Sequence, residues 1–492
     1  METIAYTRQQ QRTKPLSLAK KLIYGLGELP YGILNSVIGT FLMLYYVQII
    51  GVSASSIGLL IGLALLLDAL TDPILAEFSD RLCSRLGRRH ALMYASSIPF
   101  GVSIYCLMAP PQDLDDALLL TWVGSFLVLT RLCYTVFSIP WEALLPELGG
   151  DYEGRASLAA WRRFSAWLVS TIGVGFVMLV IFAGSDAYPQ GQLNPDAYPA
   201  YALFAGLSIT ICILVTTHFT RDQIPYLLQP QVSSSITPQM LVNSIASVIA
   251  NKNFQMLMCG VLIFFCVGAV ATSFDIFVFT YFWRLTSEDL FVLQVGGMFG
   301  AVTGVIVAAQ LVKRFQKHQL LILAIAANIC LNASLPVLRQ GEVFPPNSSA
   351  FFLPLLSVTQ ALVALFSTVA GITSLSMFAD LVDEQELNNG RRQEAMFSAG
   401  LTFGMKAAGA LGVMISGVVL EHFIGFDASA VGLTPMEIED TVLFKLAITD
   451  ALILNALLVF CLVFFRRYTL TKDSVAQIQM ELANRTRTSE RR

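Results

Sequence analysis

The sequence has little charge and lacks the short patterns that mark most enzymes and metal proteins. Only 13% of its 492 residues are Asp, Glu, Lys or Arg, against roughly 25% in soluble domains. It has no GxxxxGK[ST] loop for ATP, no HExxH or GxSxG motif and no histidines at metal-ligand spacing. The eight cysteines form no CxxC pair and nearly all lie in apolar stretches, so we expect neither disulfides nor a metal site. These absences argue against a soluble enzyme or a metalloprotein.

Apolar residues occupy most of the chain instead. Hydrophobic residues make up 55% of it, and the mean hydropathy is +0.65. A helix needs about 20 apolar residues to cross the hydrocarbon layer, and six such stretches occur in each half of the sequence. We expect spanning helices at 22–49, 57–77, 91–109, 118–145, 159–183, 201–219, 256–282, 291–311, 320–338, 351–378, 396–423 and 442–465. The composition therefore predicts an all-α membrane protein with twelve transmembrane helices.

Lysine and arginine gather in the loops that would lie on one side of the membrane. With the N-terminus inside, basic groups fall at 8–21, 81–89, 313–317 and 391–392, whereas Arg284 and Arg339 lie in outer loops. The positive-inside rule then places both termini in the cytoplasm, as in a multi-pass protein of a plasma membrane such as the bacterial inner membrane. Residues 1–21 lack an apolar core and a cleavage site, so we expect no cleaved signal peptide.

A polar, proline-containing stretch separates the two predicted halves. We expect a cytoplasmic segment at 1–21, a six-helix bundle at 22–220, a cytoplasmic linker at 221–253, a second bundle at 254–466 and a cytoplasmic tail at 467–492. Residues 239–254 within the linker predict a helix lying along the inner interface. The joints after the fourth and tenth helices both contain acidic residues and then a Gly-Arg pair. Two parallel six-helix repeats with a cavity between them are the architecture of major facilitator transporters.

Two aspartates lie where charge is most costly. Asp68 and Asp72 lie one helical turn apart near the middle of the second predicted helix, where a carboxylate costs at least about 2.5 kcal/mol. Lys406 lies at a similar depth in the eleventh. A purely structural ion pair is one interpretation, but two acids and one base leave a charge for a mobile cation or a proton to neutralise.

Polar residues also follow one face of two other helices. Tyr24, Glu28, Tyr31 and Asn35 have helical spacing on the first, and Arg131, Thr135, Ser138 and Glu142 have it on the fourth. The stripes predict a water-filled cavity between helices. The alternative is that Glu28 and Arg131 form a single interhelical ion pair. Arg163, near the start of the fifth helix, is either a cavity residue or an interfacial side chain.

At this point the sequence resembles the glycoside-pentoside-hexuronide:cation symporters, including the melibiose/sodium permease. The resemblance covers nearly the whole chain, and its most specific parts are "DALTDP" at 68–73 and "GRRQEAMF" at 390–397, followed by Lys406. It implies a cation site of Asp68, Asp72 and Thr135 with Lys406 beside it. It also implies inner-loop residues that control opening: Asp80, Arg81, Arg88 and Arg89 in "SDRLCSRLGRR", with Asp380, Asp383 and Arg391 as the matching cluster of the second half.

The sequence departs from that family where the sugar binds. Gly32 and Ser138 stand where the melibiose permease has carboxylates for the sugar hydroxyls, and Glu142 replaces the aromatic residue under the sugar ring. Arg163 matches the family's arginine on the fifth helix. The coupling site therefore resembles the family's, whereas the galactoside site does not. A solute carrying its own charge, such as a hexuronate, fits these residues better than melibiose.

These observations predict a secondary symporter that couples a small organic solute, a sugar or sugar acid, to sodium or a proton. A symporter of a non-sugar solute, such as a lysolipid or a zwitterionic amphiphile, is the alternative within transport. A non-transporting membrane sensor or a membrane-embedded enzyme is the alternative outside it. We expect no cofactor besides the coupling ion, no nucleic-acid partner, and a monomer whose partners are the solute, the cation and the lipid bilayer.

Overall fold

The computed structural model describes residues 16–82, 84–227, 251–389, 394–426 and 431–490. Within these ranges twelve helices are long and apolar enough to cross a membrane, so the predicted all-α fold with twelve transmembrane helices is confirmed. The predicted interfacial helix at 239–254 falls mostly outside the described residues, and residues 252–254 belong to the next spanning helix.

The first half of the chain forms six spans. The first span is interrupted and the others are mostly continuous: α1 (Leu18–Gly25), η1 (Leu26–Glu28), α2 (Leu29–Asn35), η2 (Ser36–Phe41), α3 (Leu42–Leu44) and η3 (Tyr45–Ile50), then α4 (Ala54–Arg81), α5 (Arg88–Met108), α6 (Asp116–Gly149), α7 (Tyr152–Phe176) with η4 (Val177–Ile181), and α8 (Tyr198–Thr220) with η7 (Arg221–Tyr226). The short turns η5 (Gly191–Leu193) and η6 (Pro195–Ala197) lie between the last two spans.

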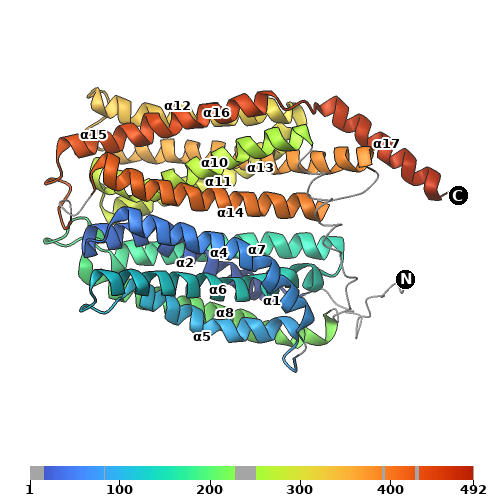
Figure 1. The fold of residues 1–492 in the computed structure, drawn as a ribbon, viewed down its shortest axis with the longest axis horizontal. Helices are drawn as coiled ribbons and strands as arrows, with labels where there is room; N and C mark the ends of the chain where they lie inside the picture. The colour runs from blue at the N-terminus through green and yellow to red at the C-terminus, as the bar shows by residue number, and fades with distance from the viewer. Residues whose placement is uncertain (1–15, 83, 228–250, 390–393, 427–430, 491–492) are drawn as a thin grey trace.

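The second half repeats this plan and adds a terminal helix. Its spans are α10 (Lys252–Phe277) with η8 (Val278–Phe282), α11 (Ser287–Arg314), α12 (Lys317–Gln340), α13 (Phe352–Asn389), α14 (Glu394–Val418) with η9 (Val419–Ile424), and α15 (Asp440–Ile448), η11 (Thr449–Ile453) and α16 (Leu454–Arg466) as one span. The polar helix α17 (Lys472–Glu490) follows and extends beyond the bundle (Figure 1).

Side-chain caps fix where several spans begin. Ser53, Asp115, Asp151 and Asn251 each accept a hydrogen bond from the backbone N–H three residues later, at the starts of α4, α6, α7 and α10. Such caps satisfy amides that have no partner in the first helical turn. The helices therefore begin earlier than the apolar stretches predict, because polar first turns belong to the helix but carry no hydropathy signal.

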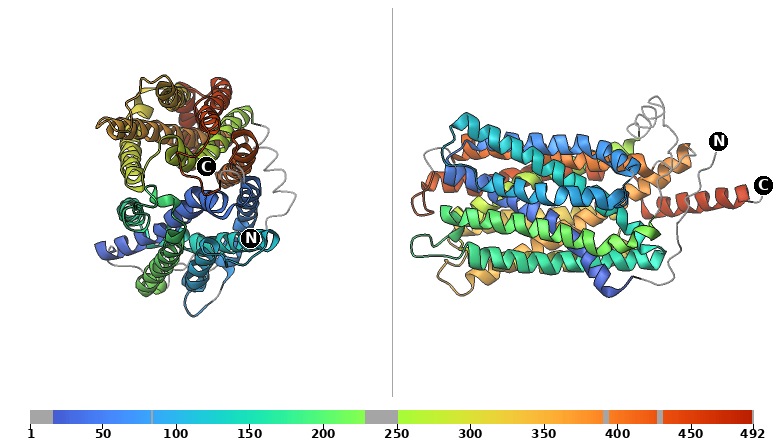
Figure 2. Two further views of the ribbon diagram at one scale, coloured as in Figure 1. Left: turned by 90° about the vertical axis from the view of Figure 1, so that its left-hand side faces the viewer. Right: turned by 90° about the horizontal axis from the view of Figure 1, so that it is seen from below.

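The two halves lie side by side, with α4 against α14 between them (Figures 1 and 2). A Cβ atom added to Gly417 would lie 2.3 Å from the carbonyl oxygen of Ala54, and one added to Gly58 would lie 2.8 Å from that of Val413. Only glycine permits backbones to approach this closely. We call the end of the bundle that carries α17 the α17 end, and the opposite end the far end. The glycine contact lies toward the far end.

Candidate functional site

Four side chains from three helices form a polar cluster between the halves. Lys406 Nζ on α14 donates to Asp68 Oδ2 at 2.8 Å and to Asp72 Oδ2 at 2.5 Å, both on α4. Thr135 Oγ1 on α6 donates to Asp68 Oδ1 at 2.6 Å. The structure therefore brings together the four residues that the resemblance assigns to a cation site.

The cluster lies near the middle of the membrane, and only some of its side chains are exposed to solvent. Asp68 is 13 residues from the α17 end of its helix, about 20 Å at 1.5 Å per residue, and Lys406 is 12 residues from the same end of α14, about 18 Å. The Asp68 side chain is 2% exposed, whereas those of Asp72 and Lys406 are 29% and 26% exposed. One carboxylate is thus sealed by protein, while its neighbour and the ammonium face a cavity.

That cavity holds about 480 Å³ and is lined by both halves. Of the residues predicted to line it, Tyr31, Asn35, Arg131, Ser138 and Glu142 do so, with Asp68, Asp72 and Lys406 at one wall. The lining also includes the apolar side chains of Ile38, Met43, Ile61, Leu65 and Val413. Ile61 and Leu65 precede Asp68 on α4, and Val413 follows Lys406 on α14, so the apolar residues lie toward the far end of the cavity and the charged residues toward its α17 end.

The positively charged guanidinium of Arg131 lies in the cavity wall, and it forms no ion pair with a carboxylate in the described structure. Its Nε atom is buried and has no hydrogen-bond partner there. Tyr31 and Tyr134 lie beside the cavity with their ring centroids 5.9 Å apart. A buried guanidinium whose donors are not all used favours an anion, so this wall is suited to a negatively charged group next to an aromatic surface.

Glu28 does not line the cavity as its helical spacing predicts. The prediction assumed a continuous α-helix, but residues 26–28 form the 3₁₀ turn η1, which changes the direction of the residues before it relative to those after it. Glu28 instead pairs with Arg162 on α7, and its other oxygen lies 3.6 Å from Arg163 Nη1. The interpretation of a Glu28–Arg131 pair is therefore wrong.

Arg163 is not a cavity residue, because its side chain is 77% exposed and it is absent from the cavity lining; its exposure agrees with the alternative of an interfacial side chain. Its neighbour Arg162 makes the interior contacts that sequence reasoning overlooked. The Arg162 guanidinium lies 4.2 Å from the Trp141 ring centroid, pairs with Glu28, and lies 3.7 Å from Glu142 at the cavity. Two adjacent arginines gave no signal in the sequence to show which faces inward.

The predicted inner-loop residues of the first half form ion pairs at the α17 end. We call such an ion pair between two helices a charge clamp. Glu147 at the end of α6 pairs with Arg88 at 2.9 Å and with Arg89, both at the start of α5. Asp80 lies 3.7 Å from Arg88, and Arg81 pairs within its own helix with Glu77. Glu147 was not among the predicted residues, although it lies in "PEL" at the end of α6, in the joint after the fourth helix.

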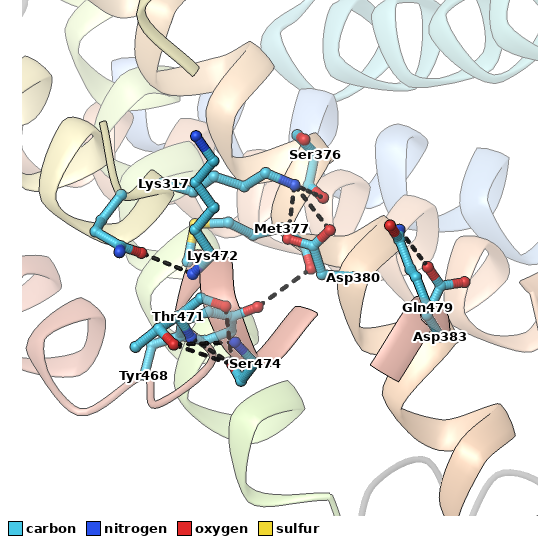
Figure 3. A network of polar contacts seen from close by, with 11 residues as sticks. Lys317, Ser376, Met377, Asp380, Asp383, Tyr468, Thr471, Lys472, Ser474 and Gln479 are labelled. Atoms are coloured by element: carbon cyan, nitrogen blue, oxygen red, sulfur yellow. Dashed lines mark hydrogen bonds and ion pairs between the residues drawn. The ribbon is translucent and has the colours of Figure 1, made fainter. Parts of the chain in front are cut away.

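The second half contains the matching clamp, shown in Figure 3. Lys317 at the start of α12 donates to both oxygens of Asp380 on α13, at 2.7 and 2.6 Å. This repeats the first clamp, since α12 and α13 are the second half's equivalents of α5 and α6. Asp383 accepts a hydrogen bond from Gln479 on α17 at 3.1 Å. Arg391 lies outside the described residues.

The chain between α16 and α17 is anchored on the same clamp (Figure 3). Tyr468 donates to the carbonyl oxygen of Met377, one turn before Asp380. Burial raises the pKa of Tyr468 well above its usual value, so the hydroxyl remains neutral and able to donate. Lys472 Nζ donates to the carbonyl oxygen of Lys313 at the end of α11. The segment that follows α16 thus connects that helix to α13 through Met377 and to α11 through Lys313.

Comparisons with known proteins place the chain among transporters. The family model described as MFS/sugar transport protein matches residues 23–472. The inner membrane symporter YicJ of Escherichia coli is 24% identical over 96% of this chain and 96% of its own length. The isoprimeverose transporter of Lactiplantibacillus pentosus is 22% identical over 82% of this chain and 80% of its own. A solved structure of a mutant nucleoside transporter NupG has a TM-score of 0.65 at 11% identity and covers 92% of this chain and 99% of its own, which is a likeness of fold.

Proposed function

The chain belongs to the MFS/sugar transport protein family, and on that premise we propose that Asp68, Asp72 and Thr135 bind the cation that drives its transport. It is a symporter and not an enzyme. The driving force is the ion gradient, worth about 2.3 kcal/mol per charge per 100 mV. No cofactor is needed besides the coupling ion, and a monomer suffices because one chain supplies both walls of the site.

The contact between Lys406 and the two aspartates carries the proposal. Within the hydrogen-bonded cluster, two carboxylates and one ammonium leave one negative charge, and Arg131 lines the same cavity without pairing directly with it in the described structure. Oxygen ligands of this kind suit sodium, and a carboxylate also accepts a proton. Lys406 already lies between Asp68 and Asp72, so an arriving cation repels it from at least one of them. Because Lys406 belongs to the second half and the aspartates to the first, ion binding changes a contact between the halves.

The same displacement links the ion to the solute. An ammonium released from a carboxylate, together with Arg131, presents two positive groups to the cavity. A solute carboxylate that pairs with them binds better once the cation has arrived, and by linkage the solute strengthens cation binding equally. We therefore propose an acidic solute of sugar size, of which a hexuronate is an example.

A zwitterionic amphiphile is the second candidate. The apolar wall of Ile38, Met43, Ile61, Leu65 and Val413 favours it, since a hydrocarbon tail gains about 0.8 kcal/mol for each buried CH₂. A neutral galactoside is not favoured. At Gly32 an added Cβ would contact nothing within 4 Å, so this position offers open space and no hydrogen-bonding group.

Basic side chains support a cytoplasmic position for the α17 end. Arg81, Arg88, Arg89, Lys313, Arg314 and Lys317 lie there, whereas Arg284 and Arg339 lie at the far end. The positive-inside rule then places both termini in the cytoplasm of a cell whose plasma membrane contains the protein. The cavity lining reaches Glu142, whose side chain is 58% exposed, toward the α17 end, so we assign this arrangement to the inward-facing half of the cycle.

Uptake into vesicles of the purified protein tests the function. Glucuronate, a lysophospholipid and melibiose would each be supplied under an imposed sodium gradient, an imposed pH gradient, or neither. We expect accumulation of the acidic sugar under one of the gradients. Asp68→Asn should abolish it, whereas Asp222→Asn, which neutralises an exposed carboxylate paired with Lys20, should not, because such surface pairs contribute about 0–1 kcal/mol.

Each outcome has a distinct meaning. Gradient-driven uptake that survives in both Asp68→Asn and Asp72→Asn would contradict the ion site. Accumulation of the lysophospholipid alone would select the second candidate. Melibiose uptake that Arg131→Ala leaves intact would show that solute recognition lies elsewhere in the cavity.

A further inference from the structure

A loop of the first half inserts a glutamine into the second half at the far end. Gln192 lies in η5 and is fully buried. Its Nε2 donates to Thr280 Oγ1 and to the carbonyl oxygen of Leu285, each at 3.1 Å, and its Oε1 accepts from Ser287 Oγ at 2.7 Å. Both ends of the amide are therefore used, and all three partners belong to the other half.

The loop holds this glutamine in a fixed place. A Cβ on Gly191 would lie 1.8 Å from the carbonyl oxygen of Phe182, so only glycine lets the loop fold against the end of the fifth span. Tyr198 OH donates to the carbonyl oxygen of Gln192 at 2.8 Å. Its position is thus set within the first half, independently of the contacts that it makes across the interface.

A second glutamine makes a weaker contact across the same end. Gln48 Oε1 accepts from Tyr281 OH at 2.9 Å, and its carbonyl oxygen accepts from the amide of Gly432. Its Nε2, however, is buried without a hydrogen-bond partner in the described structure. An unsatisfied buried donor favours any arrangement that lets water reach it. The Gln48 amide would therefore gain a hydrogen bond when the far end opens, which makes this contact weaker.

A carboxylate of the second half completes the far-end contacts. Glu421 in η9 accepts from Ser53 Oγ at 2.6 Å and from the Ser55 amide at 2.8 Å, at the start of α4. A negative side chain is favourable at a helix N-terminus, where backbone amides point outward. This contact joins the same two helices, α4 and α14, that carry the ion site.

We propose that Gln192 is a closing residue of the far end, and that its three hydrogen bonds to the second half shift the ratio of far-end-closed to far-end-open protein toward the closed form. The inference rests on the proposed symport function, because it assigns a step of alternating access. Gln192 should contribute more to closure than Gln48, because both polar atoms of its side-chain amide have partners in the closed form. Two of these partners, Thr280 and Ser287, are fully buried, and both lose their hydrogen bonds to Gln192 when the far end opens.

Spin-label distances across the far end test this without measuring transport. The labels would replace Gln112 in the first half and Met436 in the second, both exposed in far-end loops, in the full-length protein with its native cysteines replaced. Gln192→Met keeps volume but removes the amide. We expect the open-to-closed ratio to rise by about tenfold or more, the equivalent of about 1.4 kcal/mol. Ser287→Ala, which removes one of the three bonds, should give a smaller rise.

Asn347→Ala is the matched control. Asn347 is also a far-end amide with a backbone acceptor, the carbonyl oxygen of Trp283 at 2.8 Å, but it and that partner belong to the same half. Unchanged distances in Gln192→Met and Ser287→Ala, or an equal change in Asn347→Ala, would overturn the proposal. If Gln192→Met does not fold, Ser287→Ala against Asn347→Ala decides. Failure of the symport proposal would appear separately, as absence of gradient-driven uptake by the parent protein.

Discussion

Replacing Lys406 by alanine should make the empty protein depend on cations for its stability. The ammonium lies 2.8 Å from Asp68 Oδ2 and 2.5 Å from Asp72 Oδ2, so these oxygens are no more than about 5.3 Å apart. Two unit charges at that separation repel by about 3 kcal/mol at an effective dielectric constant of about 20. Without Lys406, a bound sodium ion or proton relieves this repulsion. We expect its affinity to rise about a hundredfold, since about 1.4 kcal/mol corresponds to tenfold.

Thermal unfolding of the purified variant measures this directly. Sodium chloride would be titrated against choline chloride at constant ionic strength, and the pH varied in parallel without sodium. A ligand that binds the folded state raises the melting temperature by mass action, so Lys406→Ala should respond at far lower sodium or proton concentration than the parent. In an Asp68→Asn background the repulsion is absent, and the Lys406→Ala response should largely disappear. Identical titrations of the parent and Lys406→Ala, or strictly additive effects of the two substitutions, would refute the reasoning.

Three further predictions concern the ion site, the helix contact and the solute. Asp72→Asn should abolish gradient-driven accumulation while leaving expression and membrane insertion unchanged, because removing a charge from a membrane-spanning helix lowers the cost of insertion; loss of the protein from the membrane fraction would contradict this. Gly417→Leu should prevent close approach of α4 to α14 at Ala54, and it should lengthen spin-label distances across the far end. Calorimetry should detect no melibiose binding at low millimolar concentration, since two lost charge-assisted hydrogen bonds of roughly 1.5–3 kcal/mol each reduce affinity by a factor of hundreds.

The spanning helices could be predicted from the sequence because the membrane imposes a length and a composition on each of them. The interruptions of the first span could not. Residues 26–28 form a 3₁₀ turn and residues 36–41 a π-helix, and hydropathy is the same whichever hydrogen-bond pattern the backbone adopts. The 3₁₀ turn contains Glu28, whereas Tyr31 and Asn35 lie in the α-helix that follows it, and only these two line the cavity.

The ion cluster was accessible to sequence reasoning because intramembrane charges are rare and must find partners. Depth along each helix sufficed to match Lys406 with Asp68 and Asp72. The roles of Arg162 and Gln192 were not accessible in this way. Arg162 differs from Arg163 only in rotation about its helix, and Gln192 lies in a loop whose partners, such as Ser287, depend on how the two halves pack.

The halves are joined at two depths by contacts of different kinds, and this difference bears on coupling. The mid-depth contact of Lys406 with Asp68 is electrostatic, so an arriving cation weakens it. The far-end contacts of Gln192 are neutral hydrogen bonds, which a cation at mid-depth does not alter. At about 0.5–1.5 kcal/mol each, its three bonds hold the far end closed by roughly 1.5–4.5 kcal/mol. A cation alone therefore removes only part of the energy that holds the halves together. With the ion as its only ligand, such a transporter resists opening of the far end. This resistance is the condition for using the ion gradient to move the solute, because the ion then does not cross alone.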